Sequence, residues 1–289
     1  MYDIFLLVGG EATRLQPLSL GTPKALLTIK DIKIIDLIFD EFLKIGKFDF
    51  HLICSEKHKI LWEEYVSKTS KNITLHFEAE KLDTAGYIVQ NIELLPDSFF
   101  CMNGDLLLNV NLEELINAGL SSNNSLIGSI EVVDPSRYGV IEIADTGQVL
   151  NFIEKPKDLK FGNKISLGFY HLYKSDILEV SPSLGIPCSF ERNLFPLLAK
   201  KGLLDTFTVK GNMIDVGTLE SYIAAHIEDG SKNWISNNNV HIDSNVFIQN
   251  SVILENCIVE NNVSITNSII SPNSTIKSGS NIKHEIVRT

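Results

Sequence analysis

Hydrophobic and polar positions divide the first hundred residues into alternating strands and helices. Short continuous apolar runs predict buried strands over 3–8, 49–54, 73–77 and 98–102. Apolar residues at helical spacing predict helices over 34–46, 57–67 and 84–95. Strands that alternate with helices indicate βαβ units and therefore an α/β fold with a doubly wound, mostly parallel sheet. In such sheets ligands bind at the carboxyl ends of the strands.

The pattern changes twice in the second half of the chain. Strands dominate from 126 to 174, and helices are predicted again over 189–201 and 218–227. After Gly230 the composition changes to Asn, Ser, Ile and Val. Aliphatic residues then recur every six positions, with Ser264 as the interruption, at Val240, Val246, Val252, Ile258, Ile270, Ile276 and Ile282.

A hexapeptide period of this kind predicts a short left-handed β-helix, in which each repeat supplies one strand of a triangular coil of roughly 18 residues. An irregular Asn- and Ser-rich loop would not maintain the register. We therefore expect one α/β domain over 1–229 and a β-helix over 237–284.

Composition and charge narrow the class of protein. Apolar residues make up 44% and charged residues 21%, as in ordinary globular proteins. The net charge of −11 argues against a nucleic-acid partner, because such binding needs a basic face. Four cysteines lie far apart, and no stretch approaches the roughly 18 apolar residues of a membrane span. We expect a cytoplasmic protein with reduced thiols and no membrane partner.

The segment from Gly9 to Ile29 contains the groups that a polyphosphate site needs. Gly9 and Gly10 follow a strand, where backbone N–H groups can approach phosphate oxygens without a side chain in the way. Arg14 offers a planar fork of donors, and Lys24 offers a compact point charge. The spacing is neither a Walker loop nor GxGxxG, so it does not predict those classes of nucleotide site.

This segment resembles the signature of the sugar-1-phosphate nucleotidyltransferase family, GGxGTRLxPLTxxxPKPLxPV. The matching residues are Gly9, Gly10, Thr13, Arg14, Leu15, Pro17, Leu18, Pro23, Lys24 and Leu26. The resemblance implies a Rossmann-like core in which Gly9, Gly10 and Thr13 hold a nucleoside triphosphate. It also implies that Arg14 and Lys24 are the principal catalytic cations. Ala12 stands where the family has a third glycine, which is unfavourable if the position needs a positive φ.

Further motifs extend the resemblance over nearly the whole chain. Residues 80–86 (EKLDTAG) resemble the ExLGTAG segment that reads the nucleobase in the family, with Asp83 in place of a glycine. The resemblance therefore implies nucleotide contacts for Glu80, Thr84, Ala85 and Gly86. Taken alone, the segment would be typical of a helix start capped by Asp83 or Thr84.

Two separate aspartates are the candidate metal ligands. Asp105 ends the tripeptide Asn103-Gly104-Asp105, whose family counterpart binds Mg²⁺ through its Asp and contacts the nucleotide through its Gly104 equivalent. Asp215 lies in IDVGT, which resembles the family motif W-x-D-x-G-T, with Met213 near the usual aromatic position. Carboxylates at strand ends suit Mg²⁺. The pairing of the two is implied by the resemblance alone, and an isolated NGD is more often a turn.

The family's sugar-phosphate contacts map onto three short motifs. YGV, FxEKP and NAGIY have counterparts at 138–140, 152–156 and 166–170, where Ser166 replaces the Asn. The resemblance implies that the sugar 1-phosphate contacts Tyr138, Gly139, Glu154, Lys155 and Gly168. Ser189-Phe190-Glu191 matches a family SFE motif and is expected to cap a helix.

Taken together, the resemblance implies nucleotidyl transfer from a nucleoside triphosphate to a sugar 1-phosphate with release of pyrophosphate. The TAG sequence is similar to that of mannose-1-phosphate guanylyltransferases, which favours GTP and mannose 1-phosphate or a related sugar. Glucose-1-phosphate thymidylyl, uridylyl or adenylyl transfer stays open.

Two functions of other classes stay open as well. Ala12, Asp83 and Ser166 are compatible with a regulatory homologue that binds a nucleotide sugar without turnover. The hexapeptide tail, with His241 and His284 as candidate bases, is compatible with an acyltransferase. Because the tail is short, we expect it to serve packing or homo-oligomerisation instead.

Overall fold

The computed structural model describes residues 1–156, 161–227 and 231–289. Internal contacts group the chain into two compact units. The first unit contains Met1–Gly9 and Asp40–Met213, and the second contains Gly10–Phe39 and Ile214–Thr289. The expected domain boundary at residue 229 lies outside the described residues, and the division into 1–229 and 237–284 stays a prediction.

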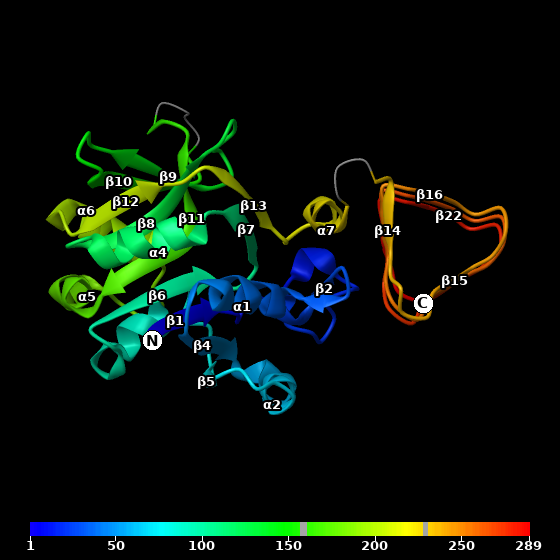
Figure 1. Cartoon of the computed structure of the whole chain (residues 1–289), viewed down its shortest axis with the longest axis horizontal. Helices are drawn as coiled ribbons and strands as arrows, with labels where there is room; N and C mark the ends of the chain where they lie inside the picture. Colours follow the sequence, from blue (N-terminus) through cyan, green and yellow to red (C-terminus); the bar gives the residue numbers. More distant parts are fainter. Residues whose placement is uncertain (157–160, 228–230) are drawn as a thin grey trace. The chain divides into compact units, whose positions relative to one another are not determined.

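A mixed sheet of nine described strands is the centre of the first unit (Figure 1). Its strands are β1 (Tyr2–Leu7), β4 (Phe48–Ser55), β5 (Ile73–Glu78), β6 (Ser98–Asn103), β8 (Ser125–Glu131), β9 (Gly139–Ile143), β10 (Val149–Glu154), β11 (Lys164–Tyr173) and β12 (Leu204–Thr208). Seven follow the order β10-β9-β11-β6-β1-β4-β5, and β8 pairs with β11 and β12. The segment β5-β4-β1-β6 is parallel, whereas β11 runs antiparallel to β6. The expected α/β sheet is confirmed.

Several of the described α-helices pack on this sheet. The described α-helices are α1 (Ile34–Ile45), α2 (Lys59–Ser67), α3 (Gly86–Gln90), α4 (Leu112–Ser121), α5 (Lys174–Val180), α6 (Phe195–Lys201) and α7 (Leu219–His226). Within the first unit, α2 packs on β4 and β5, and α4 packs on β8 and β11. The hydrophobic core against α3, α5 and α6 contains fully buried aromatic side chains such as Phe99, Tyr170 and Phe190.

Two predicted helices are shorter than expected, for local reasons. The helix predicted over 84–95 is α3 followed by a separate 3₁₀ turn at Ile92–Leu94. Asn91 separates them, because its side-chain amide donates to the carbonyl of Tyr87 (2.9 Å) and competes with helix continuation. The helix predicted over 189–201 starts as a π-helical turn, Phe190–Leu194, before α6.

A parallel β-helix dominates the second unit. Its strands are β14 (Asn233–Ile235), β15 (His241–Ile242), β16 (Phe247–Gln249), β17 (Ser251–Ile253), β18 (Ile258–Val259), β19 (Ser264–Thr266), β20 (Ile269–Ile270), β21 (Thr275–Ile276), β22 (Asn281–Lys283) and β23 (Ile286–Val287). They form three parallel sheets, β14-β17-β20-β23, β15-β18-β21 and β16-β19-β22. The hairpin of β2 (Thr28–Ile29) and β3 (Ile32–Lys33) also belongs to this unit. The β-helix expected from the hexapeptide period is confirmed.

Part of the expected register is wrong. Val259 pairs with Ile242 on one side and with Ile276 on the other, so the chain advances by 17 residues per coil there, whereas β14 and β17 pair at a spacing of 18. In a coil of 17 residues two sides take six residues and the third takes five, which moves a strict period of six out of phase. Ile258 is therefore 45% exposed, while Cys257 and Val259 beside it are fully buried.

Asparagines at the corners of the coils explain the Asn-rich composition. Left-handed backbone, with φ between 44° and 62°, occurs at Asn239, Asn245, Asn250, Asn256, Asn262, Asn267 and Asn273. Asparagine tolerates this region better than other residues with a side chain. Stacked corners also bond to one another, since the Asn250 amide donates to the Oδ1 atom of Asn267 (2.6 Å).

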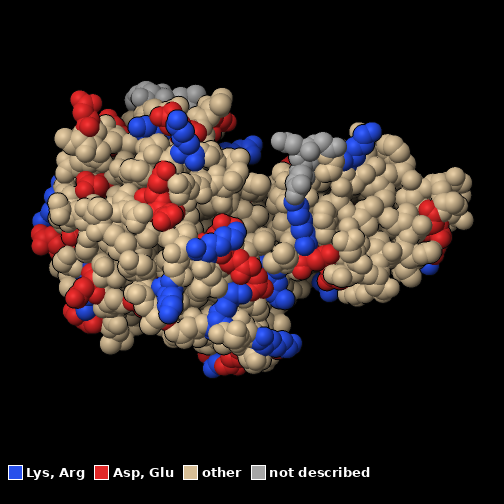
Figure 2. All heavy atoms as spheres, in the orientation of Figure 1, with Lys and Arg blue, Asp and Glu red and all other residues tan. Residues whose placement is uncertain are grey.

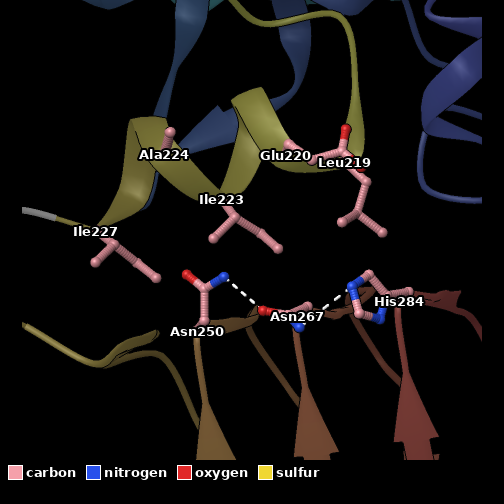
Figure 3. A pocket seen from close by; sticks show the side chains of 8 residues that line it. All are labelled: Leu219, Glu220, Ile223, Ala224, Ile227, Asn250, Asn267 and His284. Carbon is pink, nitrogen blue, oxygen red and sulfur yellow. Dashed lines mark hydrogen bonds between the residues drawn. The ribbon is translucent and has the colours of Figure 1, made fainter.

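Helix α7 belongs to the same unit as the β-helix and packs against β17. The Tyr222 hydroxyl donates to the carbonyl of Thr28 (2.6 Å), and the His226 ring lies against Trp234. A cavity of about 540 Å³ remains beside these contacts (Figure 3). It is lined by Leu219, Glu220, Ile223, Ala224, Ile227, Asn250, Asn267 and His284. None of the site residues expected from the nucleotidyltransferase motifs lines this cavity, although His284, a candidate base of the acyltransferase alternative, does.

Among the described residues, no helix is both long enough and apolar enough to cross a membrane. On the face drawn in Figure 2, acidic and basic side chains of the described residues are interspersed, and no broad basic area forms.

Candidate active site

Gly9 and Gly10 leave the backbone of the phosphate loop uncovered by side chains. A Cβ atom at either position would not clash with its neighbours. A Cβ atom on Gly9 would lie 3.5 Å from the Ser55 nitrogen and 3.7 Å from the Oε2 atom of Glu78, which is ordinary contact. A Cβ atom on Gly10 would meet nothing within 4 Å. Gly9 follows the carboxyl end of β1 and is the last residue of the first of the two segments that form the first unit. Gly10 is the first residue of the second unit. Open backbone at this position suits close approach of a phosphate.

Ala12 is compatible with the loop, because its φ is −72° and the position needs no left-handed conformation. Its carbonyl accepts a hydrogen bond from the Ser19 hydroxyl (2.6 Å), and its side chain is buried. The next three residues form a 3₁₀ turn, Thr13–Leu15, in which Leu15 is fully buried. Thr13 and Arg14 are exposed on this anchored turn. The missing family glycine therefore does not disturb the backbone here.

Three charged side chains of the second unit surround Gly217. The Nζ atom of Lys24 lies 2.9 Å from the Oδ1 atom of Asp215, and the Lys24 side chain is only 8% exposed. A Cβ atom on Gly217 would lie 2.9 Å from the Nη2 atom of Arg14, 3.0 Å from Asp215 Oδ1 and 3.3 Å from Lys24 Nζ. The structure thus brings together the two predicted cations and one of the two predicted metal ligands.

Gly217 was missed among the site residues expected from the sequence. Its position in Asp-x-Gly-Thr was a signal, but its role depends on contacts with Arg14 and Lys24, which are distant in the chain. The Gly217 N–H donates to the Ser221 hydroxyl (3.1 Å), which also receives a bond from the Thr218 N–H at the start of α7. A helix start therefore fixes the backbone around the charged cluster.

Asp105, the other predicted metal ligand, belongs to the first unit. It lies in the turn between β6 and β7 (Leu106–Val110), directly after Gly104. The Gly104 N–H donates to the Leu7 carbonyl (3.0 Å), and a Cβ atom there would lie 2.4 Å from Val8 Cγ1. Only glycine fits this contact. Gly104 therefore holds Asp105 at the end of β1, where the phosphate loop begins.

The donor chemistry of the two aspartates fits Mg²⁺. Carboxylate oxygens are hard ligands, and Mg²⁺ takes one or two of them while it keeps most of its waters and binds substrate phosphates. Among the described residues, no group of three or more His, Cys, Asp or Glu side chains forms a cage for a metal. The metal itself stays a prediction.

The segment expected to read the nucleobase is attached to the chain around Ser189. The Ala85 N–H donates to the Cys188 carbonyl (2.8 Å), and the Cys188 N–H donates to the Leu82 carbonyl (2.9 Å). The Thr84 hydroxyl donates to Glu191 (2.8 Å) and accepts from the Phe190 N–H (3.0 Å). Thr84 thus holds the segment in place.

Close backbone contacts shape the rest of this segment. A Cβ atom on Gly86 would lie 2.5 Å from the Cβ atom of Leu82, so this glycine permits the tight turn. Asp83, which replaces a family glycine, has a φ of 66° and so adopts the left-handed conformation that glycine would adopt. Ala85 is buried, whereas Glu80 is exposed.

Glu78 is a second residue that sequence reasoning missed. It ends β5, two residues before Glu80, and its Oε1 atom is buried without a hydrogen-bond partner among the described residues. Burial, and then the nearby Asp83 carboxylate, raises the pKa of Glu78 to about 7. The side chain lies beside Gly9, at the carboxyl end of the parallel strands. Glu78 lies far along the chain from the signature at Gly9 to Ile29. Its position at the end of a strand was therefore the one sequence feature that could have indicated a binding role.

The residues expected to contact the sugar phosphate form a second group in the first unit. The Lys155 N–H donates to the Tyr138 carbonyl (3.0 Å), and Lys155 Nζ lies 3.1 Å from Glu154 Oε1. A Cβ atom on Gly139 would lie 3.2 Å from Glu154 Oε2. Four of the five predicted sugar-side residues therefore lie together.

The fifth, Gly168, lies beside the Asn103 side chain. It has a φ of 66°, and a Cβ atom there would lie 2.9 Å from the Nδ2 atom of Asn103. The Ser166 hydroxyl accepts a hydrogen bond from the Gly168 N–H (3.1 Å). Ser166, which replaces the family Asn, thus stabilises this left-handed turn.

The chain is similar to several known proteins. Residues 4–232 match the family described as nucleotidyl transferase. The chain is 30% identical over 233 residues to a mannose-1-phosphate guanyltransferase of Saccharomyces cerevisiae, covering 77% of this chain and 63% of that protein. It is 30% identical to the mannose-1-phosphate guanylyltransferase catalytic subunit beta of Dictyostelium discoideum, covering 76% of this chain and 62% of that protein. The chain thus spans less than two thirds of the length of these relatives.

A solved structure is similar as well. The crystal structure of HddC from Yersinia pseudotuberculosis superposes with a TM-score of 0.63 at 27% identity. The match covers 78% of this chain and 98% of that chain.

Proposed function

The chain belongs to the nucleotidyl transferase family, and on that premise we propose that it transfers a guanylyl group from GTP to mannose 1-phosphate. The observation that carries the reaction type is the group of Arg14, Lys24 and Asp215 around Gly217. Two cations and one carboxylate, fixed by close packing, suit the charge that develops on a departing pyrophosphate. The names of the relatives support guanine and mannose as the base and the sugar.

In the proposed reaction, an oxygen of the sugar 1-phosphate attacks the α-phosphorus of GTP. One P–O bond forms, the bond from the α-phosphorus to the bridging oxygen breaks, and pyrophosphate leaves with that electron pair. No protein nucleophile is needed, because the sugar phosphate is already an anion at neutral pH. Arg14 and Lys24 neutralise the developing charge, and the Asp215 ion pair holds Lys24 Nζ in place.

We propose that Asp105 and Asp215 hold Mg²⁺, which would supply positive charge to the phosphate oxygens when it is bound. Glu154 would accept hydrogen bonds from sugar hydroxyls, Lys155 would neutralise the sugar phosphate, and Gly168 would let the sugar approach the backbone.

Glu78 supports guanine over the other bases. Guanine presents two adjacent donors, N1–H and N2–H, which match the two oxygens of a carboxylate. Adenine, thymine and uracil do not present two adjacent donors on that edge. A buried carboxylate oxygen that, like Glu78 Oε1, has no partner among the described residues is costly unless a ligand donor reaches it, which favours a guanine-containing substrate.

The regulatory homologue without turnover is the second candidate. Its support came from the substitutions at Ala12, Asp83 and Ser166. In the structure Ala12 has an ordinary φ, Asp83 adopts the glycine conformation, and Ser166 bonds to Gly168. Since the backbone accommodates all three, these substitutions do not favour the binding protein over the enzyme.

Pyrophosphate release tests the proposal, measured with Mg²⁺ across a grid of GTP, ITP, ATP, UTP and dTTP against mannose and glucose 1-phosphates. We expect turnover with GTP and mannose 1-phosphate. ITP, which lacks the N2 amino group, should be used at least about tenfold less well, because one Glu78 bond is lost. Turnover with UTP or dTTP and glucose 1-phosphate would instead establish the alternative substrates. A blank grid from folded protein, with nucleotide-sugar binding intact, would establish the binding homologue.

Two further expectations belong to the same proposal. We propose that the enzyme is cytoplasmic and that its β-helix forms contacts between copies of the chain. The molar mass in solution, compared with and without residues 231–289, would test the role of the β-helix.

A further inference from the structure

Asp83 occupies a backbone conformation that normally favours glycine, and both of its carboxylate oxygens have partners. Its Oδ1 atom accepts a hydrogen bond from the Thr84 N–H (3.0 Å). Its Oδ2 atom forms an ion pair with the Nη2 atom of Arg192. The Asp83 side chain is 26% exposed and the Arg192 side chain 63% exposed. A residue in the left-handed region persists where its surroundings hold it, and these two contacts do so.

Arg192 itself is fixed by a separate set of contacts. It lies in the π-helical turn Phe190–Leu194, and its N–H donates to the Ser189 hydroxyl (3.3 Å). Ser189 in turn donates to Glu191 (2.6 Å), which also receives the Thr84 hydroxyl. The guanidinium therefore projects from a capped turn onto a segment that lies 109 residues earlier in the chain.

We propose that Arg192 is a positioning residue for nucleobase recognition, which acts through Asp83 on the base-binding segment 80–86 and on the carboxylate of Glu78. The inference rests on the proposed function, because it assigns Arg192 a part in binding GTP. Arg192 is not expected to touch the base itself. It would hold the Asp83 turn closed and neutralise the Asp83 charge that faces Glu78.

The proposed electrostatic effect of Arg192 on Glu78 follows from the groups around the Glu78 carboxylate. The Asp83 carboxylate opposes ionisation of Glu78, and burial acts in the same direction. Cys54 from β4 and Tyr87 from α3 also face Glu78, and burial raises the pKa of each, so both stay neutral at physiological pH. Without Arg192 the Asp83 charge would be uncompensated, and the pKa of Glu78 would rise further. Because only the ionised carboxylate accepts both guanine donors, GTP would bind well only at higher pH.

A mutant cycle on this pair tests the inference in the intact chain. The variants are Arg192→Gln, Asp83→Gly and the double variant, each assayed for KM and kcat with GTP from pH 6 to 9. Lys201→Gln is the matched control, since it removes an exposed ion pair with Glu179 (3.0 Å) that lies outside segment 80–86. Melting temperatures identify any variant that fails to fold.

We expect Arg192→Gln to raise the KM for GTP about tenfold with kcat within about twofold. The KM for mannose 1-phosphate should stay unchanged, and the acid limb of kcat/KM for GTP should move to higher pH. The double variant should recover to within about threefold of the wild-type KM, since glycine adopts this conformation unaided and carries no charge. Lys201→Gln should behave as wild type.

An unchanged KM and pH profile in Arg192→Gln would overturn the inference while the enzyme function stands. A double variant as impaired as Arg192→Gln would also overturn it, because a purely structural role of Arg192 predicts that result. If the wild type shows no turnover, GTP binding by calorimetry replaces KM as the readout. A wild type that neither binds nor uses GTP would overturn the proposed function and this inference together.

Discussion

Lys24 Nζ lies 2.9 Å from Asp215 Oδ1, although 191 residues separate the two along the chain. Lys24 is nearly buried, whereas the Asp215 side chain is 44% exposed. A buried ammonium group needs a partner charge, and an exposed carboxylate keeps capacity for a further ligand. The ion pair therefore joins the phosphate loop to Asp215, one of the two proposed metal ligands.

Removal of the Lys24 charge should slow the reaction more than it weakens substrate binding. We expect Lys24→Met to lower kcat by about 10²–10³, as for loss of a group that stabilises charge in the transition state. Steady-state kinetics of pyrophosphate release would measure this, with Lys44→Met, an exposed lysine paired to Glu41, as the control. Equal kcat values in the two variants would contradict the role given to Lys24.

Gly217→Ala should impair turnover without unfolding the protein. The added methyl would lie 2.9 Å from Arg14 Nη2 and 3.0 Å from Asp215 Oδ1, so both groups must move. We expect kcat/KM to fall at least about tenfold. The melting temperature should change little, because flexible side-chain ends move instead of backbone. Gly185→Ala, where a Cβ meets nothing within 4 Å, is the matched control.

Ala12→Gly should bring no gain in activity. The φ of −72° at this position suits alanine, so a glycine adds only freedom in the unfolded chain. We expect turnover within about twofold of wild type and a loss of about 1 kcal/mol in the free energy of unfolding. Denaturant titration and the pyrophosphate assay would measure the two quantities. A large rise in kcat would mean that Ala12 does restrict the loop.

The coil of 17 residues predicts a large loss of stability on truncation of one isoleucine of the β-helix and a small loss on truncation of another. Ile265 is fully buried inside the coil, whereas Ile258 is 45% exposed. Of these two residues, Ile258 is the one that fits the strict period of six. Ile265→Ala should cost about 2–5 kcal/mol of unfolding free energy. Ile258→Ala should cost much less, about 0.5 kcal/mol. Thermal or chemical unfolding would decide, and equal losses would contradict the register.

His226 should make stability depend on pH. Burial lowers its pKa from 6.5 to about 4, and its buried Nε2 atom has no hydrogen-bond partner among the described residues. His226 therefore binds a proton below about pH 6.5 in the unfolded chain but only below about pH 4 in the native state. Stability is complete above 6.5 and falls as the pH drops from 6.5 to 4, by up to about 1.4 kcal/mol per pH unit.

His226→Phe should remove this dependence while it keeps the packing on Trp234. We would measure the free energy of unfolding of wild type and variant between pH 4 and 7. The slopes of this free energy against pH should differ by an amount that corresponds to up to one bound proton. Parallel slopes would mean that another group binds the proton. Burial also lowers the pKa of His171 to about 4, so some slope should remain in the variant.

Local patterns in the sequence determined the elements and the loop. The strand at residues 3–8 follows from a continuous apolar run, because both faces of a buried parallel strand are covered. The helix that begins at Ile34 and the β-helix follow from side-chain periods of about 3.6 and six residues, which reflect which face is buried. The cations Arg14 and Lys24 were also predictable, because the phosphate-loop signature is contiguous.

Tertiary structure decided the properties that depend on distant residues. The ion pair of Lys24 and the contact of Arg192 with Asp83 join groups that come together only when the chain folds. Folding also buries the Glu78 oxygen that has no partner in the part of the chain that the structure describes. The same holds for the exposed Ile258, since a single five-residue side in a coil shifts the register without altering the local pattern. Periodicity reports which face of one element is buried. It does not report which charged side chain from another element lies against it, and the chemistry of this site depends on that.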